Sequence, residues 1–186
     1  FLGSTVPGTN RTQVAVDNHV LIPNFNDPFD NGLSISLWVL EYPTSESAFL
    51  QRRDNNNIDF VFSTNTDDQL YVHLGFTDFN SIDILENEQW THVTATYDEQ
   101  KVRLFKNGVL IEEQEAAQPI NHFSDDLFIG KYIYYGGLTH HFFFNGKQDD
   151  LGIWNRALSQ EEITAIYSQT QLNAGCTDPT ACNFNE

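Results

Sequence analysis

The sequence has few basic residues, no methionine and no long apolar run. Nine Lys and Arg stand against 26 Asp and Glu among 186 residues, which gives a net charge of −17. Phosphates of nucleic acid and anionic lipids repel so acidic a chain, so we expect neither as a partner. No apolar run approaches the roughly 20 residues of a membrane-spanning helix, and no signal-peptide pattern is present. Because methionine is absent, we expect Phe1 to be a processed end or a fragment boundary.

Cysteine is nearly absent as well. The chain has two, Cys176 and Cys182, and both lie in a tail of residues 173–186 with little apolar content. No Cys-x-x-Cys pair or companion His cluster indicates zinc. A small disulfide loop in an oxidising compartment is the better interpretation, and it predicts an extracellular protein. We therefore expect one domain in residues 1–172, followed by a linker or tail in residues 173–186.

Aromatic residues are abundant, with 15 Phe, seven Tyr and three Trp, and this composition favours strands. Short apolar segments alternate with turn residues along the body of the chain. Leu33–Val39 alternates apolar and small polar residues, as expected of a strand with one buried face. Asn107-Gly108 between two apolar segments predicts a hairpin with a type I′ turn. The pattern indicates an antiparallel β-sandwich.

One helix is predicted near the end of the domain. In Ser159-Gln160-Glu161-Glu162, the Ser159 hydroxyl can accept the Glu162 amide, and the Glu162 side chain can return the bond. Ile163, Ile166 and Tyr167 then fall on one face at helical spacing. We expect a short terminal helix packed on the sandwich.

Longer motifs carry a resemblance to a known family. They are Trp90–Asp98, Val102–Gly108, Leu127–Gly130 and Phe144–Ser159, supported by Val14–Ile22 and Ser34–Val39. In order and spacing they resemble laminin G-like domains of the concanavalin A-like lectin and glucanase class. The resemblance implies an all-β, two-sheet antiparallel jelly roll with one short C-terminal helix. Two positions depart from the family pattern: Gln148 stands where an aliphatic residue is usual, and Gly152 replaces a long side chain.

The family resemblance implies a non-catalytic module that binds a carbohydrate or surface glycan. The tail resembles the Gly-Cys-Thr-Asp-Pro segments that link modules in large secreted bacterial proteins. This implies part of a multidomain, secreted or cell-surface chain, and we expect the isolated domain to be a monomer. A protein-interaction or spacer module of an adhesin is one alternative, and a glycan-active enzyme of the same fold is another.

The resemblance also implies a structural Ca²⁺ ion. In such domains the ion lies where an early turn meets an acidic pair on the closing strand. The matching positions are Asp17 and Asn18 in the turn and Asp149 and Asp150 on the strand. Neighbouring strand residues point to opposite faces, so at most one of the pair is expected to bind by its side chain. The alternative is that Asp149 accepts bonds from loop amides.

Two segments hold candidate ligand contacts. Tyr134, Tyr135 and His140 lie beside a Gly-Gly pair, and a tyrosine ring suits stacking on a sugar with its hydroxyl free to bond. Arg52 and Asn55 belong to a polar segment that offers hydrogen-bond donors and acceptors. The alternatives are core and cross-strand packing for the aromatics and a solvated turn for the polar segment.

A near-match to a glycanase motif bears on the enzyme alternative. Ser81-Ile82-Asp83-Ile84-Leu85-Glu86 resembles the Glu-x-Asp-x-x-Glu strand of retaining glycanases, except that Ser81 stands at the place of the nucleophile. Without a carboxylate there, the two-carboxylate mechanism fails. We interpret the segment as an ordinary strand and predict no catalytic residues.

Overall fold

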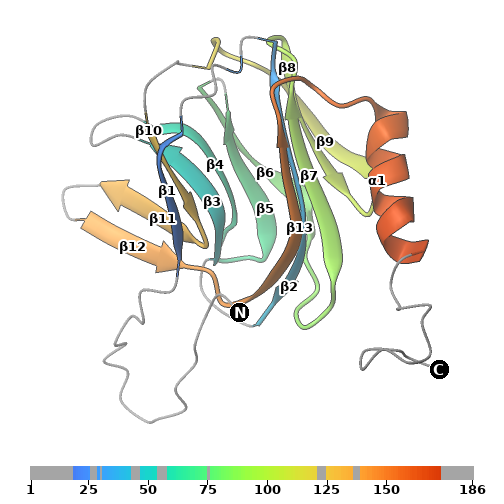
Figure 1. Ribbon diagram of the computed structural model, residues 1–186, viewed down its shortest axis with the longest axis horizontal. Coiled ribbons are helices and arrows are strands. Elements are labelled where there is room, and N and C mark those ends of the chain that lie inside the picture. The colour runs from blue at the N-terminus through green and yellow to red at the C-terminus, as the bar shows by residue number, and fades with distance from the viewer. Residues whose placement is uncertain are drawn as a thin grey trace.

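The computed structural model describes residues 19–25, 29, 31–42, 47–53, 58–74, 76–120, 125–135 and 139–172, with the backbone alone at 125, 135, 139, 140 and 170–172. Its strands form two facing antiparallel sheets, which confirms the predicted jelly-roll sandwich (Figure 1). The six-stranded sheet has the order β1 (Val20–Phe25), β10 (Asp125–Ile129), β3 (Ser47–Arg53), β4 (Ile58–Thr64), β5 (Gln69–Leu74) and β6 (Thr77–Ile84). The five-stranded sheet has the order β13 (Gly146–Trp154), β2 (Leu33–Glu41), β7 (Thr91–Tyr97), β8 (Lys101–Lys106) and β9 (Val109–Glu115). A separate two-stranded sheet holds β11 (Lys131–Tyr135) and β12 (Thr139–Phe143), and α1 (Gln160–Leu172) follows β13.

The core lies between the two large sheets. Alternate residues of β2 supply Leu33, Ile35, Leu37 and Val39, each at most 1% exposed. The facing sheet and the segment after β12 supply aromatic rings. Phe49 packs edge-on against Phe62 and Phe144, with ring centroids 5.3 and 5.8 Å apart. Burying an aliphatic or aromatic side chain of this size contributes about 1.5–3 kcal/mol, so this layer holds the sheets together.

The predicted hairpin turn is confirmed between β8 and β9. Lys106 pairs with Val109, and the two residues between them have positive φ angles, 51° at Asn107 and 77° at Gly108. A type I′ turn requires this backbone conformation. A Cβ added at Gly108 would lie 3.2 Å from the Tyr167 ring, so the turn also gives α1 room to pack.

The predicted capping box at the start of α1 is also confirmed. The Glu162 amide donates to Ser159 Oγ at 3.3 Å, and the Ser159 amide donates to the Glu162 carboxylate at 2.9 Å. Arg156 holds the same carboxylate with two bonds of 2.6 and 2.7 Å. The Arg156 guanidinium is the largest cause that lowers the pKa of Glu162, to about 2. The carboxylate is therefore ionised when it caps the helix.

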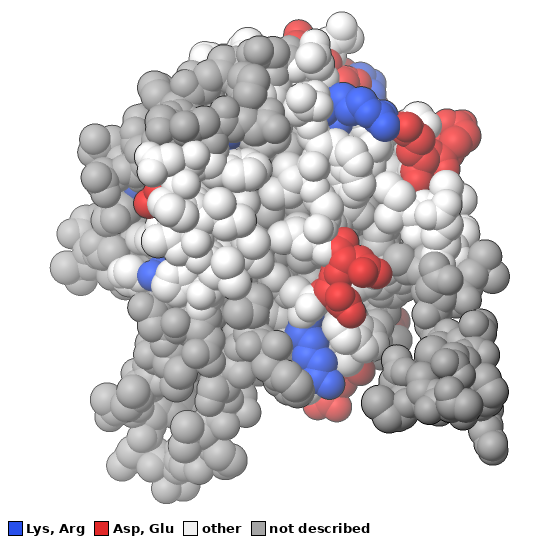
Figure 2. Space-filling model, viewed as in Figure 1, with Lys and Arg blue, Asp and Glu red and all other residues white. Residues whose placement is uncertain are grey.

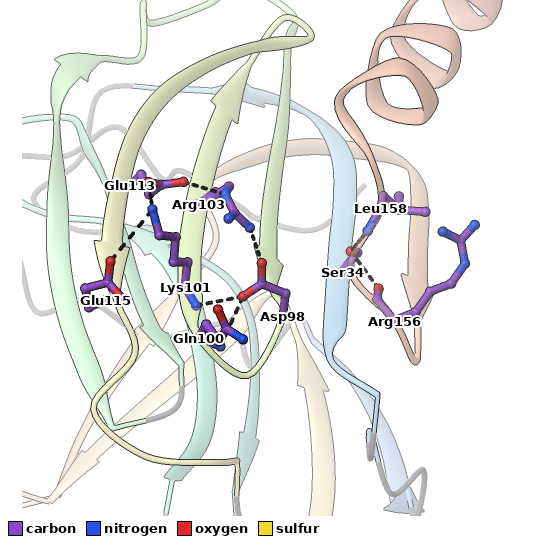
Figure 3. Close-up of polar contacts among 9 residues, drawn as sticks. All are labelled: Ser34, Asp98, Gln100, Lys101, Arg103, Glu113, Glu115, Arg156 and Leu158. Carbon is purple, nitrogen blue, oxygen red and sulfur yellow. Dashed lines mark hydrogen bonds and ion pairs between the residues drawn. The ribbon is translucent and has the colours of Figure 1, made fainter.

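Helix α1 packs on the outer face of the five-stranded sheet (Figure 1). Ser34 of β2 joins the two, because its hydroxyl donates to the Arg156 carbonyl and accepts the Leu158 amide, both at 2.8 Å (Figure 3). Phe105, Leu158 and Ile163 form a small second core there. Under the helix, His92 of β7 is 1% exposed and lies 2.8 Å from Ser36 Oγ.

The polar segment that holds Arg52 begins inside a strand and not in a solvated turn, because Arg52 and Arg53 belong to β3. Arg52 points into the sandwich, where it is 1% exposed. Its Nε lies 3.1 Å from the Asp59 carboxylate and its guanidinium lies 5.1 Å from the centre of the Phe29 ring. An arginine in this setting is compatible with a strand, because its charge is paired and its stem is packed. In the described part of the chain, no helix has the length and hydrophobicity that crossing a bilayer requires.

Candidate functional site

A cavity of about 470 Å³ lies between the outer face of the six-stranded sheet and the β11–β12 hairpin. In β5, Leu70, Val72 and Leu74 fill the core, so the residues between them face outward, toward the cavity side. The sheet and the loop after β4 contribute Ser47, Ser63, Thr64, Asn65, Tyr71 and Asn80, and the hairpin contributes Tyr132, Tyr134 and Phe142. The site is thus a groove with a polar floor and an aromatic wall.

The hairpin is fastened to β3 by two buried polar side chains. Gln51 donates through Nε2 to the Ile133 carbonyl at 3.2 Å and accepts the Ile133 amide at 2.8 Å. Arg53 adds a bond of 2.6 Å from Nη1 to the same carbonyl. Gln51 is fully buried and Arg53 is 4% exposed. The Gln51 side-chain amide therefore bonds both backbone groups of Ile133, as a neighbouring strand would. These bonds hold the aromatic wall over the sheet.

The aromatic wall consists of rings that support one another. Tyr132 stacks on Phe142, with centroids 5.6 Å apart and planes at 21°, and Tyr134 lies 6.4 Å from Tyr132. Tyr134 is 48% exposed, so part of its ring is open to solvent. A flat tyrosine face with a polar edge can stack on the C–H face of a sugar ring while its hydroxyl bonds to sugar hydroxyls.

Tyr71 presents a fixed hydroxyl on the floor of the cavity. Its O–H donates to Asp78 Oδ1 at 2.7 Å, and His73 Nδ1 lies 2.6 Å from the same oxygen. Burial, followed by the Asp78 bond, raises the pKa of Tyr71 above its usual range, so the phenol stays protonated. Because the phenol hydrogen is directed at Asp78, the Tyr71 oxygen offers its lone pairs to a ligand as an acceptor.

A buried acid, Glu41, lies behind the part of the floor that Ser47 and Thr64 form. Thr64 Oγ1 donates to Glu41 Oε1 at 3.0 Å, and Ser47 also bonds to the Glu41 side chain. Glu41 is 4% exposed, and burial raises the pKa of its carboxyl to about 7. Both hydroxyls that contact Glu41 belong to residues that line the cavity.

Of the predicted ligand residues, the structure places Tyr134 at the cavity. Tyr135 and His140 lie on the hairpin, where His140 pairs with Tyr134 across the ladder, but their side chains are outside the described residues. Asn55 is also outside the described residues. Arg52 lies in the interior with Asp59, away from the surface on which its prediction depended.

Half of the predicted calcium site is described. Asp149 and Asp150 are exposed on β13, at a register shift opposite β2, and the Asp150 amide donates to Asp149 Oδ1 at 2.9 Å. Asp17 and Asn18 lie outside the described residues. Within the described ranges, no group of three or more His, Cys, Asp or Glu residues is arranged to hold a metal ion. The calcium site stays a prediction.

The glycanase-like segment begins directly after Asn80, which lines the cavity, but its carboxylates point elsewhere or lie beyond the strand. Ser81 is buried in β6, Asp83 is exposed and pairs with Lys106 at 3.2 Å, and Glu86 is exposed beyond the strand. Neither carboxylate belongs to a residue that lines the cavity.

Sequence reasoning missed the residues that the sheet supplies to the site. Tyr71 and Asn80 pair across β5 and β6, and Ser63 pairs with Tyr71 across β4 and β5. A signal for Tyr71 existed, because it alternates with the apolar Leu70 and Val72, which makes it the outward residue of its strand.

Comparisons with known proteins agree on the fold. The model of the concanavalin A-like lectin/glucanases superfamily matches residues 14–164. The structure resembles a SAP-like pentraxin from Limulus polyphemus, with TM-score 0.60 and 16% identity over 74% of this chain and 70% of that one. A putative carbohydrate binding protein from Bacteroides ovatus gives TM-score 0.61 and 15% identity, and the match covers 79% of this chain but only 44% of that one. Domain 4 of an extracellular arabinanase from Geobacillus stearothermophilus, solved with arabinotriose, gives TM-score 0.57 and 21% identity, over 74% of this chain and 66% of that one. A search of curated proteins finds no match.

Proposed function

The chain belongs to the concanavalin A-like lectin/glucanases superfamily, and from this membership we propose that it is a carbohydrate-binding module of an extracellular protein. The observation that carries the proposal is the cavity of about 470 Å³ under the β11–β12 hairpin, with Tyr71, Tyr132 and Tyr134 on its lining. Aromatic faces and neutral polar groups in one concave site are the groups that bind sugars. The complex of the arabinanase domain with arabinotriose supports the choice of ligand class.

We propose binding without catalysis. The described residues that line the cavity are aromatic, hydroxyl or amide residues. Most glycoside hydrolases use two carboxyl groups that flank the scissile bond. Asp83 and Glu86, the acids of the glycanase-like motif, are exposed elsewhere, and Ser81 cannot act as the carboxylate nucleophile.

Calcium and the tail form a separate part of the proposal. We propose that Asp149 contributes to a structural Ca²⁺ site together with Asp17 or Asn18, and that Cys176 and Cys182 form a disulfide. Oxygen ligands from a turn and a strand suit Ca²⁺, and an oxidising compartment suits the disulfide. The two cysteines lie outside the described residues.

Isothermal titration against a panel of polysaccharides tests the function. For a polysaccharide that the wild type binds, Tyr134→Ala should weaken binding about fivefold, because stacking of an aromatic side chain contributes roughly 1 kcal/mol. Trp90→Ala is the matched control, because Trp90 is 43% exposed, close to the 48% of Tyr134, but does not line the cavity. Equal losses in both variants, or no binding across the panel, would contradict the proposal.

A further inference from the structure

The lining of the cavity contains no charged side chain among its described residues. Its polar groups are the hydroxyls of Ser, Thr and Tyr and the amides of Asn. The Asn80 side chain is exposed and makes no hydrogen bond among the described residues, so it can donate and accept. Such groups match the hydroxyls of a sugar, which also donate and accept.

Two acids lie beside this lining. Asp78 lies 2.7 Å from the Tyr71 hydroxyl, with its carboxylate on the exposed side of the floor. Glu41 lies 3.0 Å behind the hydroxyl of Thr64. An anionic group in the cavity would approach the Asp78 carboxylate, which opposes its binding. Glu41 adds to this repulsion only where the pH exceeds the pKa of its carboxyl, about 7.

The cations near the hairpin are held by the protein itself. Arg53 is 4% exposed and donates to the Ile133 carbonyl under the hairpin. Lys131 is 7% exposed, and its Nζ lies 5.6 and 5.5 Å from the centres of the Phe128 and Phe143 rings. Neither side chain lines the cavity.

Cations farther away are engaged with acids. Arg103 bonds Asp98 and Glu113, both at 2.6 Å, and Lys101 pairs with Glu113 on the same outer surface of β8 and β9 (Figure 3). On the face seen in Figure 2, the larger patches of Asp and Glu each lie beside a patch of Lys or Arg. The described residues that line the cavity therefore include no cation that could attract a polyanion.

We infer that the cavity selects uncharged glycans and rejects glycans that carry carboxylate or sulfate groups. This inference rests on the proposed function and specifies its ligand. When a neutral sugar enters the cavity it loses hydrogen bonds to water, and the hydroxyls and amides of the site replace those bonds. A uronate or a sulfated sugar would lose the hydration of an ion and gain no cation in return.

The test uses pairs of polysaccharides that share a backbone and differ in charge: dextran and dextran sulfate, methyl-esterified polygalacturonate and polygalacturonate, mannan and polymannuronate. Titrations are run with a chelator, so that no divalent cation bridges an acidic glycan to the acidic protein. In the pair whose neutral member binds, the charged member should bind at least tenfold more weakly. Added salt should reduce this difference in affinity, because it screens the repulsion between the charged glycan and the acids.

Variants locate the effect. Asp78→Asn keeps an acceptor for Tyr71 and removes the charge. The dissociation constant of the charged polysaccharide, divided by that of its neutral partner, should therefore fall by about fivefold. Glu99→Gln removes one exposed charge at a residue that does not line the cavity, and it should leave that ratio within a factor of two. Tighter or equal binding of a charged member overturns the inference and leaves the carbohydrate-binding function standing. No binding of any member of any pair overturns both.

Discussion

Replacing Glu41 by Gln should expose a pH dependence of stability that the wild-type protein conceals. Glu41 is 4% exposed, and burial raises the pKa of its carboxyl from 4.5 to about 7. The folded state therefore binds a proton more tightly than the unfolded chain does, and Glu41 stabilises the fold at low pH. This stabilisation is lost as the pH rises through 7, and it amounts to about 2 kcal/mol between pH 5 and pH 7.5.

His92 has the opposite effect over the same range. Burial under α1 lowers the pKa of the ring from 6.5 to about 4, so His92 is neutral in the fold at pH 5 and protonated in the unfolded chain. Protonation of the unfolded chain destabilises the fold at pH 5, and this effect disappears as the pH rises above 6.5. Through His92, the free energy of unfolding therefore rises by about 2 kcal/mol from pH 5 to pH 7.5.

Urea unfolding followed by tryptophan fluorescence at pH 5 and pH 7.5 separates the two effects. The contributions of Glu41 and His92 nearly cancel in the wild type. In Glu41→Gln the free energy of unfolding should rise by about 2 kcal/mol between the two pH values, and in His92→Gln it should fall by about as much. Combining both changes should restore the flat profile. A Glu41→Gln protein whose unfolding free energy is the same at both pH values would refute the reasoning.

Three further outcomes are expected. Ser159→Ala should lower the free energy of unfolding by about 1 kcal/mol through loss of the helix cap, measured by urea unfolding at pH 7, and a change below about 0.3 kcal/mol would contradict the capping role. Gln51→Leu should speed hydrogen exchange at the Ile133 amide by about tenfold, while amides in β7 keep their protection, because the hairpin loses its two bonds to the Gln51 side chain. If Asp149 binds calcium, excess Ca²⁺ should raise the Tm of the wild type by several degrees and leave the Tm of Asp149→Asn unchanged. A wild-type Tm that is the same with and without Ca²⁺ would count against the site.

Much of the fold could be predicted because its signals are local. A type I′ turn depends on two adjacent residues, Asn107 and Gly108, whose positive φ angles are matched to their residue types. The helix start depends on Ser159 and Glu162, which contact each other across one turn. The strand at Leu33–Val39 is visible because its alternate residues are apolar. Such features need no knowledge of distant parts of the chain.

The site was predictable only in part, because its residues are brought together by long-range contacts. Tyr134 was found from its residue type, but its partners Ser63, Tyr71 and Asn80 come from three other strands. Arg52 was misjudged for a related reason, since a polar segment gives no sign that Asp59 will pair with one of its charges inside the sandwich.

The sequence alone determined the class of fold, the hairpin turn and the capped helix, because propensity, turn geometry and capping act between residues close in the chain. Only the tertiary structure decided which sheet has its outer face covered by the β11–β12 hairpin and which has it covered by α1. Gln51 and Arg53 bind Ile133, some 80 residues away, and thereby lay the tyrosines of β11 over the six-stranded sheet. Alternation along a strand shows that two faces differ, but which neighbour packs on each face depends on the arrangement of the whole chain.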